Sequence, residues 1–164
     1  MSTRITVRIQ ADVFDVAKET DVLNSPDEDV GAVSTFIGYC RSEGGRLKAL
    51  ELEHYPGMAE EEIGRVVDQA IERWPLQGVT VIHRFGKIEP GAQIVLVVTA
   101  SSHRIAAFEA ATFLMDYLKT RAPFWKKEHH KDGTAGDWVE AKEADDDADR
   151  KSTRLNSSHA NISY

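Results

Sequence analysis

The pattern of apolar residues predicts a strand followed by a helix at the centre of the fold. The run Ile94–Val98 is short, β-branched and uninterrupted, as expected of a buried strand. Residues 105–118 lack Gly and Pro, which predicts a helix, and several alanines widen its apolar face. The larger residues of that face recur at helical spacing: Ile105, Phe108, Thr112 and Met115. We therefore expect most of this helix to be buried, with Ser101 or Ser102 as its cap and Pro123 at its end.

Further strands and helices are predicted on both sides of this unit, where apolar positions alternate or recur at helical spacing. The strands span Arg4–Ile9, Gly31–Arg41, Leu47–Tyr55, Val79–Phe85 and Gln93–Ala100. Helices are predicted over 11–23 and 58–74, and Pro75 closes the second. After the central helix, the segments 124–129 and 137–142 are expected to pair as a hairpin.

This order of elements predicts an α+β fold in a single domain over residues 1–144. Residues 86–91 are expected to form an irregular connection. The first strand should face inward with its apolar positions, Ile5, Val7 and Ile9. Residues 145–164 are polar and aperiodic, so we expect a disordered or non-native tail there.

The charge and the cysteine content exclude several classes of protein. A formal net charge of −7 and a pI near 5.4 argue against a general nucleic-acid binder, which usually carries a basic face. No apolar run is as long as a membrane span, and the N-terminal residues lack the apolar core of a signal peptide. Cys40 is the only cysteine, so neither a disulfide framework nor a cysteine-based zinc site is expected. We expect a cytoplasmic protein that binds neither nucleic acid nor membrane.

Basic residues gather at both ends of the predicted central helix. His103 and Arg104 lie at its start, where free N–H groups and the positive end of the helix dipole favour an anion. A cation there destabilises the helix by about 0.3–1 kcal/mol, and a bound phosphate or carboxylate would offset this. At the far end, cations alternate with aromatic rings: Lys119, Arg121, Phe124, Trp125, Lys126 and Lys127. Spacing alone leaves a solvated surface and an anion site equally open there, but a basic cluster in an acidic protein favours a small anionic ligand.

Other candidate sites have simpler structural interpretations. The glycines of 42–46 could hold a phosphate, but they suit a turn between strands better. Glu60–Glu62 match the positive end of a helix and need no metal ion. Cys40 beside Arg41 could relay sulfur, although a small strand residue is the preferred interpretation. The histidines show no ligand spacing, so neither a metal site nor a cofactor is expected.

Five segments together resemble the catalytic large subunit of molybdopterin synthase. They read LEHYPGM (52–58), RWPL (73–76), VTVIHRFG (79–86), SHR with FEA (102–110) and MDYLKTRAPFWKKE (115–128). The resemblance runs in order over residues 30–142, nearly the whole predicted domain. The last segment is the most specific, because an unrelated core would not reproduce its Lys-Thr-Arg-Ala-Pro-Phe-Trp-Lys string.

The resemblance implies an α+β fold of the hammerhead type, with antiparallel strands and a long buried helix, and a homodimer within a heterotetramer. A ubiquitin-like sulfur-carrier small subunit would dock on each protomer and insert a C-terminal Gly-Gly tail that carries a thiocarboxylate. Two sulfurs would pass to a pterin phosphate substrate, cyclic pyranopterin monophosphate (precursor Z). The product would be the dithiolene of molybdopterin, and no metal or other cofactor is implied for this step.

The resemblance also implies the residues of the site. Lys119 and Lys126 match catalytic lysines, which could act as acid, base or nucleophile and stabilise developing negative charge. The expected substrate-binding residues are all basic: Arg41, His103, Arg104, Lys127 and Lys142.

Two positions depart from the family pattern. Tyr39 stands where relatives commonly carry a lysine, and it cannot supply a positive charge. Lys142 replaces an arginine that reaches across the dimer, and lysine lacks the planar, two-pronged contact that arginine makes with phosphate. Two other functions stay open: a non-catalytic module that binds a partner's C-terminal tail, and a Schiff-base enzyme that uses Lys119.

Overall fold

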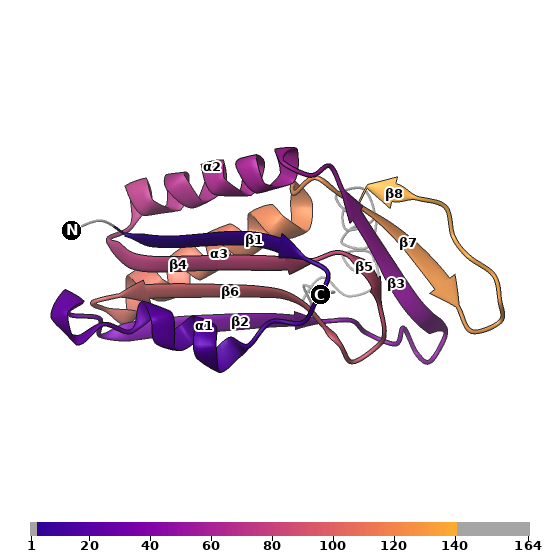
Figure 1. The fold of residues 1–164 in the computed structure, drawn as a ribbon, viewed down its shortest axis with the longest axis horizontal. Helices are drawn as coiled ribbons and strands as arrows, with labels where there is room; N and C mark the ends of the chain where they lie inside the picture. The colour runs from indigo at the N-terminus through magenta and orange to yellow at the C-terminus, as the bar shows by residue number, and fades with distance from the viewer. Residues whose placement is uncertain (1–2, 141–164) are drawn as a thin grey trace, which may run out of the picture.

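The larger of two sheets forms the centre of the molecule. The computed structural model describes residues 3–140, so the domain limit predicted at residue 144 and the predicted tail 145–164 lie outside the described residues. The four strands of the larger sheet are, in order, β1 (Arg4–Gln10), β4 (Leu76–Arg84), β6 (Gln93–Ser101) and β2 (Ala32–Tyr39). β1 runs parallel to β4, and the other neighbours are antiparallel (Figure 1).

A smaller sheet adjoins one end of the larger one. Its antiparallel strands are, in order, β5 (Gly86–Ile88), β3 (Leu47–His54), β7 (Phe124–His130) and β8 (Val139–Glu140). Figure 1 shows this sheet at the right-hand side, beyond the ends of β2, β4 and α3. The predicted α+β class with mainly antiparallel strands is confirmed.

Helices cover the larger sheet on both faces. They are α1 (Val16–Leu23), α2 (Met58–Arg73) and α3 (Arg104–Thr120), with a short 3-10 turn at Pro26–Glu28. α2 and α3 pack on one face and α1 on the other (Figure 1). None of these helices is long and apolar enough to cross a membrane.

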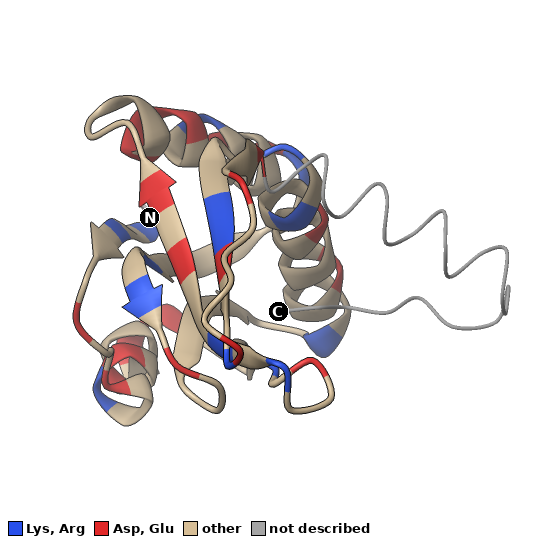
Figure 2. Ribbon diagram, turned by 90° about the vertical axis from the view of Figure 1, so that its right-hand side faces the viewer, with Lys and Arg blue, Asp and Glu red and all other residues tan. Residues whose placement is uncertain are grey.

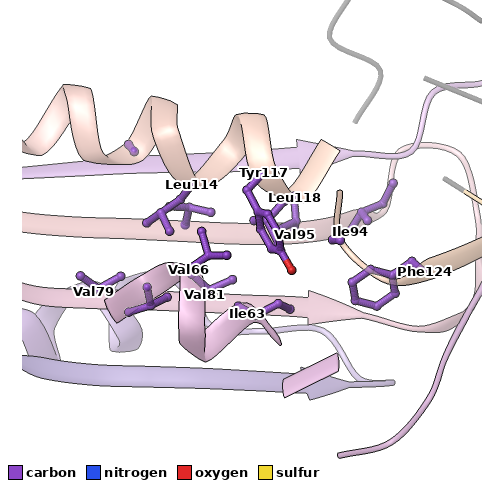
Figure 3. Packing of buried hydrophobic residues seen from close by; sticks show 14 of the residues in the cluster. Ile63, Val66, Val79, Val81, Ile94, Val95, Leu114, Tyr117, Leu118 and Phe124 are labelled. Carbon is purple, nitrogen blue, oxygen red and sulfur yellow. The ribbon is translucent and has the colours of Figure 1, made fainter. Parts of the chain in front are cut away.

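Strand β6 contributes to two cores, because successive side chains of a strand point to opposite faces. Val95 and Val97 pack in the main core with α2 and α3, whereas Leu96 and Val98 pack in the second core with α1. All four are fully buried, which confirms the buried strand predicted from the apolar run. Figure 3 shows labelled residues of the main core: Ile63, Val66, Val79, Val81, Val95, Leu114, Tyr117 and Leu118.

The structure corrects two predicted segments. The helix predicted from residue 11 begins only at Val16, because the carboxylate of Asp15 accepts a hydrogen bond from the backbone N–H of Lys18 at 3.1 Å and caps it there. Residues 86–88, predicted as part of an irregular connection, form β5. They extend because β3 offers them a hydrogen-bonding edge, which is a contact between distant parts of the chain.

The first strand is less buried than predicted. Val7 and Ile9 pack against the main core as expected, but Ile5 is 48% exposed. β1 is an edge strand of the larger sheet, and Ile5 is its second residue, near the N-terminal end of the strand. The alternating pattern therefore identified the strand and its face, but not how far the core extends along it.

The face of α3 that packs on the sheet is the alanine face, not the stripe of larger residues. Its buried members are Ala106, Ala107, Ala110, Ala111, Leu114, Tyr117 and Leu118. Ile105 and Phe108, both predicted to be buried, are 63% and 60% exposed. Small side chains allow a helix backbone to lie close to a sheet, so the alanine face packs there and the larger side chains turn outward.

Candidate active site

A groove of about 250 Å³ runs between α3 and the edge strand β2. Its lining residues are Ser34, Thr35 and Phe36 from β2, and Phe108, Ala111, Thr112, Met115, Asp116 and Lys119 from α3. The outward stripe of α3 thus forms one wall of a mostly apolar groove. Such a groove accepts an extended chain more readily than a bulky, strongly charged ligand.

Lys119 lies at one end of this groove, in the last turn of α3. A cation is favourable there because the helix dipole is negative at the C-terminus. The side chain is partly buried, so its charge is held near apolar walls rather than in bulk water. The catalytic role of Lys119 stays a prediction, and its position suits a negatively charged group entering along the groove.

Arg41 follows β2 at the end of the larger sheet that adjoins the smaller one, which we call the junction end. The backbone just before it is held in place, because Cys40 N donates to Ala92 O at 2.9 Å and Gly91 N donates to Cys40 O at 2.7 Å. The guanidinium of Arg41 is exposed and lies 3.3 Å from the carboxylate of Glu43. The side chain of Arg41 therefore extends from a fixed backbone, and its guanidinium is accessible to an anion in solution.

Cys40 itself is a buried residue of the main core. Its Sγ lies 3.8 Å from the carbonyl oxygen of Ile88. Burial raises the pKa of the Cys40 thiol, Glu43 raises it further, and Lys126 only partly opposes them. Since sulfur relay requires a thiolate, the structure favours the interpretation of Cys40 as a strand residue.

Lys126 and Lys127 point to opposite faces of the smaller sheet, since neighbours on a strand alternate. Lys126 pairs with the buried residue Leu52 and faces the interior, on the side of Cys40. Lys127 faces outward, with its Nζ 5.7 Å from the centre of the Trp138 ring. Figure 2 views this sheet and shows basic residues of β7 beside acidic residues of β3. The side chain of Lys127, predicted to bind substrate, therefore points to the opposite side of the sheet from that of Lys126.

Aromatic packing fixes the start of β7. The rings of Phe124 and His83 are stacked, with centres 4.0 Å apart and planes inclined by 18°. Burial lowers the pKa of His83 to about 4, so the ring is neutral near pH 7 and its Nδ1–H donates to Arg84 O at 2.9 Å. The ring of His54 tilts against Phe124 as well. These contacts place Lys126, two residues further along β7, in a defined position.

His103 and Arg104 lie at the opposite end of α3, and both side chains are exposed. The predicted serine cap is wrong, because the hydroxyls of Ser101 and Ser102 donate to backbone carbonyls of neighbouring segments. His103 occupies the cap position but makes no capping hydrogen bond, and the first turn contains no acidic residue. The N–H groups of this turn are therefore available to an anion.

The two ends of α3 cannot meet within one chain. Arg104 and Lys119 lie near the two ends of a 17-residue helix, roughly 22 Å apart at about 1.5 Å per residue. Figure 1 shows the C-terminal end of α3 beside the smaller sheet and its N-terminal end at the far side of the molecule. Arg41, Lys119 and Lys126 lie toward the junction end, whereas His103 and Arg104 do not. One chain alone therefore does not bring all the predicted site residues together.

The groove itself was missed in the sequence. Phe36 and Asp116 line it although neither was a candidate, and Phe108 and Met115 were assigned to the core. A signal was present, because α3 carries both a stripe of alanines and a stripe of larger apolar residues, and one sheet can cover only one of them. Lys142, the remaining candidate, lies outside the described residues.

Histidines of the smaller sheet and its flank pair individually with glutamates rather than converging on one point. The pairs are His129 with Glu51 at 2.8 Å, His130 with Glu128 at 3.3 Å and His54 with Glu60 at 3.8 Å. Within residues 3–140, no group of three or more His, Cys, Asp or Glu side chains is placed to hold a metal ion.

Comparison with known proteins gives consistent matches over most of the chain. The family model described as MoaE protein matches residues 9–121. A molybdopterin synthase catalytic subunit from Mesorhizobium japonicum is 68% identical over 146 residues, covering 89% of this chain and 92% of the relative. The subunit of the same name from Rhizobium meliloti is 62% identical, with 94% and 99% covered. The solved structure of the molybdopterin biosynthesis MoaE protein from Burkholderia ambifaria MC40-6 superposes with a TM-score of 0.75 at 44% identity, covering 90% of this chain and 97% of that one.

Proposed function

The chain belongs to the MoaE family, and on that premise we propose that it transfers sulfur from a thiocarboxylated carrier subunit to cyclic pyranopterin monophosphate. The resemblance stated from the sequence is confirmed, and with it the prediction of an enzyme of the molybdopterin synthase class. The sulfur donor, the pterin acceptor and the assembly are the proposed part. The observation that carries the proposal is the apolar groove that ends at Lys119.

The groove suits the C-terminal tail of a small carrier protein. An extended Gly-Gly segment has no side chains, so its backbone can lie between the walls formed by Phe36 and Phe108. A thiocarboxylate at the tip of that tail would bring its negative charge to Lys119. The relatives are named as subunits of a synthase, which supports an assembly with a second protein.

The basic residues of the junction end would stabilise the charge that the reaction produces. Sulfur transfer leaves a carboxylate on the carrier and opens the cyclic phosphate of the pterin. Lys119 at the groove end and Lys126 on the inner face of β7 are fixed cations, which stabilise developing charge without reorganisation. Arg41 is exposed at the same end of the sheet and would hold the substrate.

A two-fold dimer would supply the cations that one chain cannot bring to the groove. In a symmetric contact the same surfaces meet in both directions, so the N-terminal end of one α3 can lie beside the C-terminal end of the other. His103 and Arg104 would then complete the site of the partner. Ile105, exposed beside them, offers apolar surface for such a contact. With one carrier on each protomer, the assembly is a homodimer within a heterotetramer, and Lys142 would make a weaker contact across it than an arginine.

The proposal includes no resident metal or cofactor, and it places the reaction in the cytoplasm. The carrier thiocarboxylate is a substrate that brings the sulfur with it. Cys40 is buried as a free thiol in the main core, which suits a reducing compartment.

Two alternative functions make different predictions. A passive module would bind the carrier tail without forming product. A Schiff-base enzyme would be trapped by borohydride as an adduct on Lys119 in the presence of a carbonyl substrate. The cations at both ends of α3 support the proposed enzyme over the passive module, because a groove that only binds a tail has no need of His103 and Arg104.

The direct test is to mix the purified chain with a thiocarboxylated carrier and the pterin precursor, and to follow the pterin by mass spectrometry. The expected result is a pterin that gains two sulfurs while the carrier tail becomes a carboxylate. The same mixture with a carrier that already ends in a carboxylate is the control. A carrier that binds while the pterin mass stays constant would reject the enzyme and favour the passive module.

A further inference from the structure

We propose that Gln77, together with Gly31, is a positioning residue for the anion-binding end of α3. The inference rests on the proposed function, since it concerns how His103 and Arg104 are held for the phosphate of the pterin. It assigns a role in substrate binding to two residues that lie outside the candidate site.

Gln77 connects three segments through its side-chain amide. It is the second residue of β4, and its Nε2 donates to the backbone carbonyl of Glu28 and, at 3.0 Å, to the hydroxyl of Ser102. The same hydroxyl donates to the carbonyl of Asp29 at 3.1 Å. The amide therefore ties β4 both to the turn before β2 and to the residue that precedes His103.

Gly31, the residue just before β2, contacts the same segment at the end of β6. Its backbone N–H donates to the carbonyl oxygen of Ser101 at 2.9 Å. A Cβ atom at position 31 would overlap the carbonyl oxygen of Ser102. The two backbones are thus in direct contact, and position 31 requires glycine for space rather than for an unusual backbone angle.

These contacts matter because His103 and Arg104 are exposed and lie before the first packed residues of α3, Ala106 and Ala107. His103 makes no capping bond, and Arg104 places a positive charge at the positive end of the helix dipole. Residues 102 and 103 connect β6 to α3, so the position of Ser102 influences the direction in which the first turn points. Fixing Ser102 therefore fixes the N–H groups and the guanidinium that would meet a phosphate.

The effect of losing Gln77 should be confined to this end of the molecule. Ser101 keeps a separate hydrogen bond, from its hydroxyl to the carbonyl of Pro75 at 2.8 Å, so the end of β6 remains attached. Lys119 lies at the other end of α3, and neither Gln77 nor Ser102 lines the groove, which runs from Phe108 to Lys119. Substrate affinity should change, while the chemical step and carrier docking should not.

The test is Gln77→Met, which keeps the length of the side chain and removes both donated hydrogen bonds. With saturating thiocarboxylated carrier and varied pterin precursor, we expect KM for the pterin to rise about five- to tenfold and kcat to stay within about twofold. The matched control is Thr3→Val, which removes the hydrogen bond from Thr3 Oγ1 to Leu76 O (2.8 Å), beside Gln77 on the same strand. Thr3→Val should leave KM unchanged.

The outcomes separate this inference from the proposed function. An unchanged KM in Gln77→Met, alongside raised KM values in His103→Ala and Arg104→Ala, overturns the inference alone. Unchanged KM values in all three overturn the anion site and the inference with it. A fall in kcat as large as the rise in KM, or a loss of carrier binding, indicates a general structural role and also overturns positioning. Gln77→Leu, which also removes both donated hydrogen bonds and adds no charge near the anion site, should reproduce the KM effect if Gln77→Met does not fold.

Discussion

The two ends of α3 are held in different ways. At the C-terminal end, Tyr117 and Leu118 are buried in the main core, and β7 follows almost directly. At the N-terminal end, Arg104 and Ile105 are exposed, and their position depends on hydrogen bonds made by Ser102. The C-terminal end is packed up to its last turn, whereas at the N-terminal end packing begins only at Ala106, so the residues before it should be more sensitive to the loss of a hydrogen bond.

The cations at the two ends also differ in their cost to the helix. Lys119 suits the negative end of the dipole, whereas Arg104 opposes the positive end. A cation placed where it destabilises the helix indicates an anionic ligand, because the charge of the ligand would offset the repulsion. A cation placed where it is favourable needs no such ligand. Arg104 is thus the clearer sign of a bound anion, and the case for Lys119 depends on the groove.

Lys119→Ala should have the largest effect. Turnover should fall about 10²–10³-fold, because a fixed cation near the developing charge is lost, while the carrier should still bind the apolar walls. Product formation measured by mass at saturating substrates gives the rate. Lys18→Ala, which removes an exposed lysine of α1, is the control. A Lys119→Ala rate within about twofold of the unmodified chain would exclude the catalytic assignment.

Acid should weaken the packed end of α3, where His83 stacks on Phe124. Burial lowers the pKa of His83 from 6.5 to about 4, so between these values the unfolded chain binds a proton that the folded chain does not. The free energy of unfolding therefore has its full value above pH 6.5. It falls as the pH drops toward 4, by up to about 3 kcal/mol, because protonation of His83 favours the unfolded chain.

Urea unfolding at about pH 7.5 and about pH 5 measures this dependence. His83→Phe keeps a ring against Phe124 and cannot take up a proton, so the free energy of unfolding should change less with pH in this variant. The same pH dependence in both proteins would show that other groups cause it.

Arg104→Ala should weaken binding of the pterin about tenfold or more, since a charge-assisted contact to phosphate is lost. Calorimetric titration with the pterin precursor measures this. Affinity for the carrier tail should be unaffected, because Arg104 does not line the groove, which runs along α3 from Phe108 to Lys119. Equal pterin affinity with and without the guanidinium would count against an anion site at the N-terminal end.

The smallest effects should be opposite in sign at the two ends. Arg104→Gln should stabilise the ligand-free chain and Lys119→Gln should destabilise it, each by about 0.3–1 kcal/mol. Glutamine matches both residues in helix propensity, so the change in charge dominates. Thermal unfolding at low salt measures both, and shifts of the same sign would show that the dipole does not decide these stabilities.

The local sequence pattern is enough to predict an element when the residues that begin and end it are visible in the same segment. α2 was predicted over 58–74 and is found at Met58–Arg73, because its apolar stripe is regular and Pro75 follows. β5 was missed, because its three residues are extended only by pairing with β3. The parallel pairing of β1 with β4 likewise depends on contacts between distant segments.

The candidate site shows the same division between local and distant information. Its basic residues came from a resemblance and from the helix ends, both of which are visible in the sequence. The groove depended on which stripe of α3 packs on the sheet, and that choice is made by the close approach of Ala107 and Ala110 to the strands. Lys126 and Lys127 are neighbours on a predicted strand and so face opposite sides, but only the register of β7 on β3 shows that Lys126 is the inward one.

Only residues 121–123 separate the end of α3 at Thr120 from the start of β7 at Phe124. Ala122 within this linker is buried, and so is Phe124, the first residue after the linker. An inserted residue would therefore displace a buried side chain. The spacing between Lys119 and Lys126 is therefore set by a rigid connector. An engineer who wishes to fit a longer or shorter acceptor molecule must reshape the far walls, because the backbone positions of these two lysines cannot be moved relative to each other without disturbing the core.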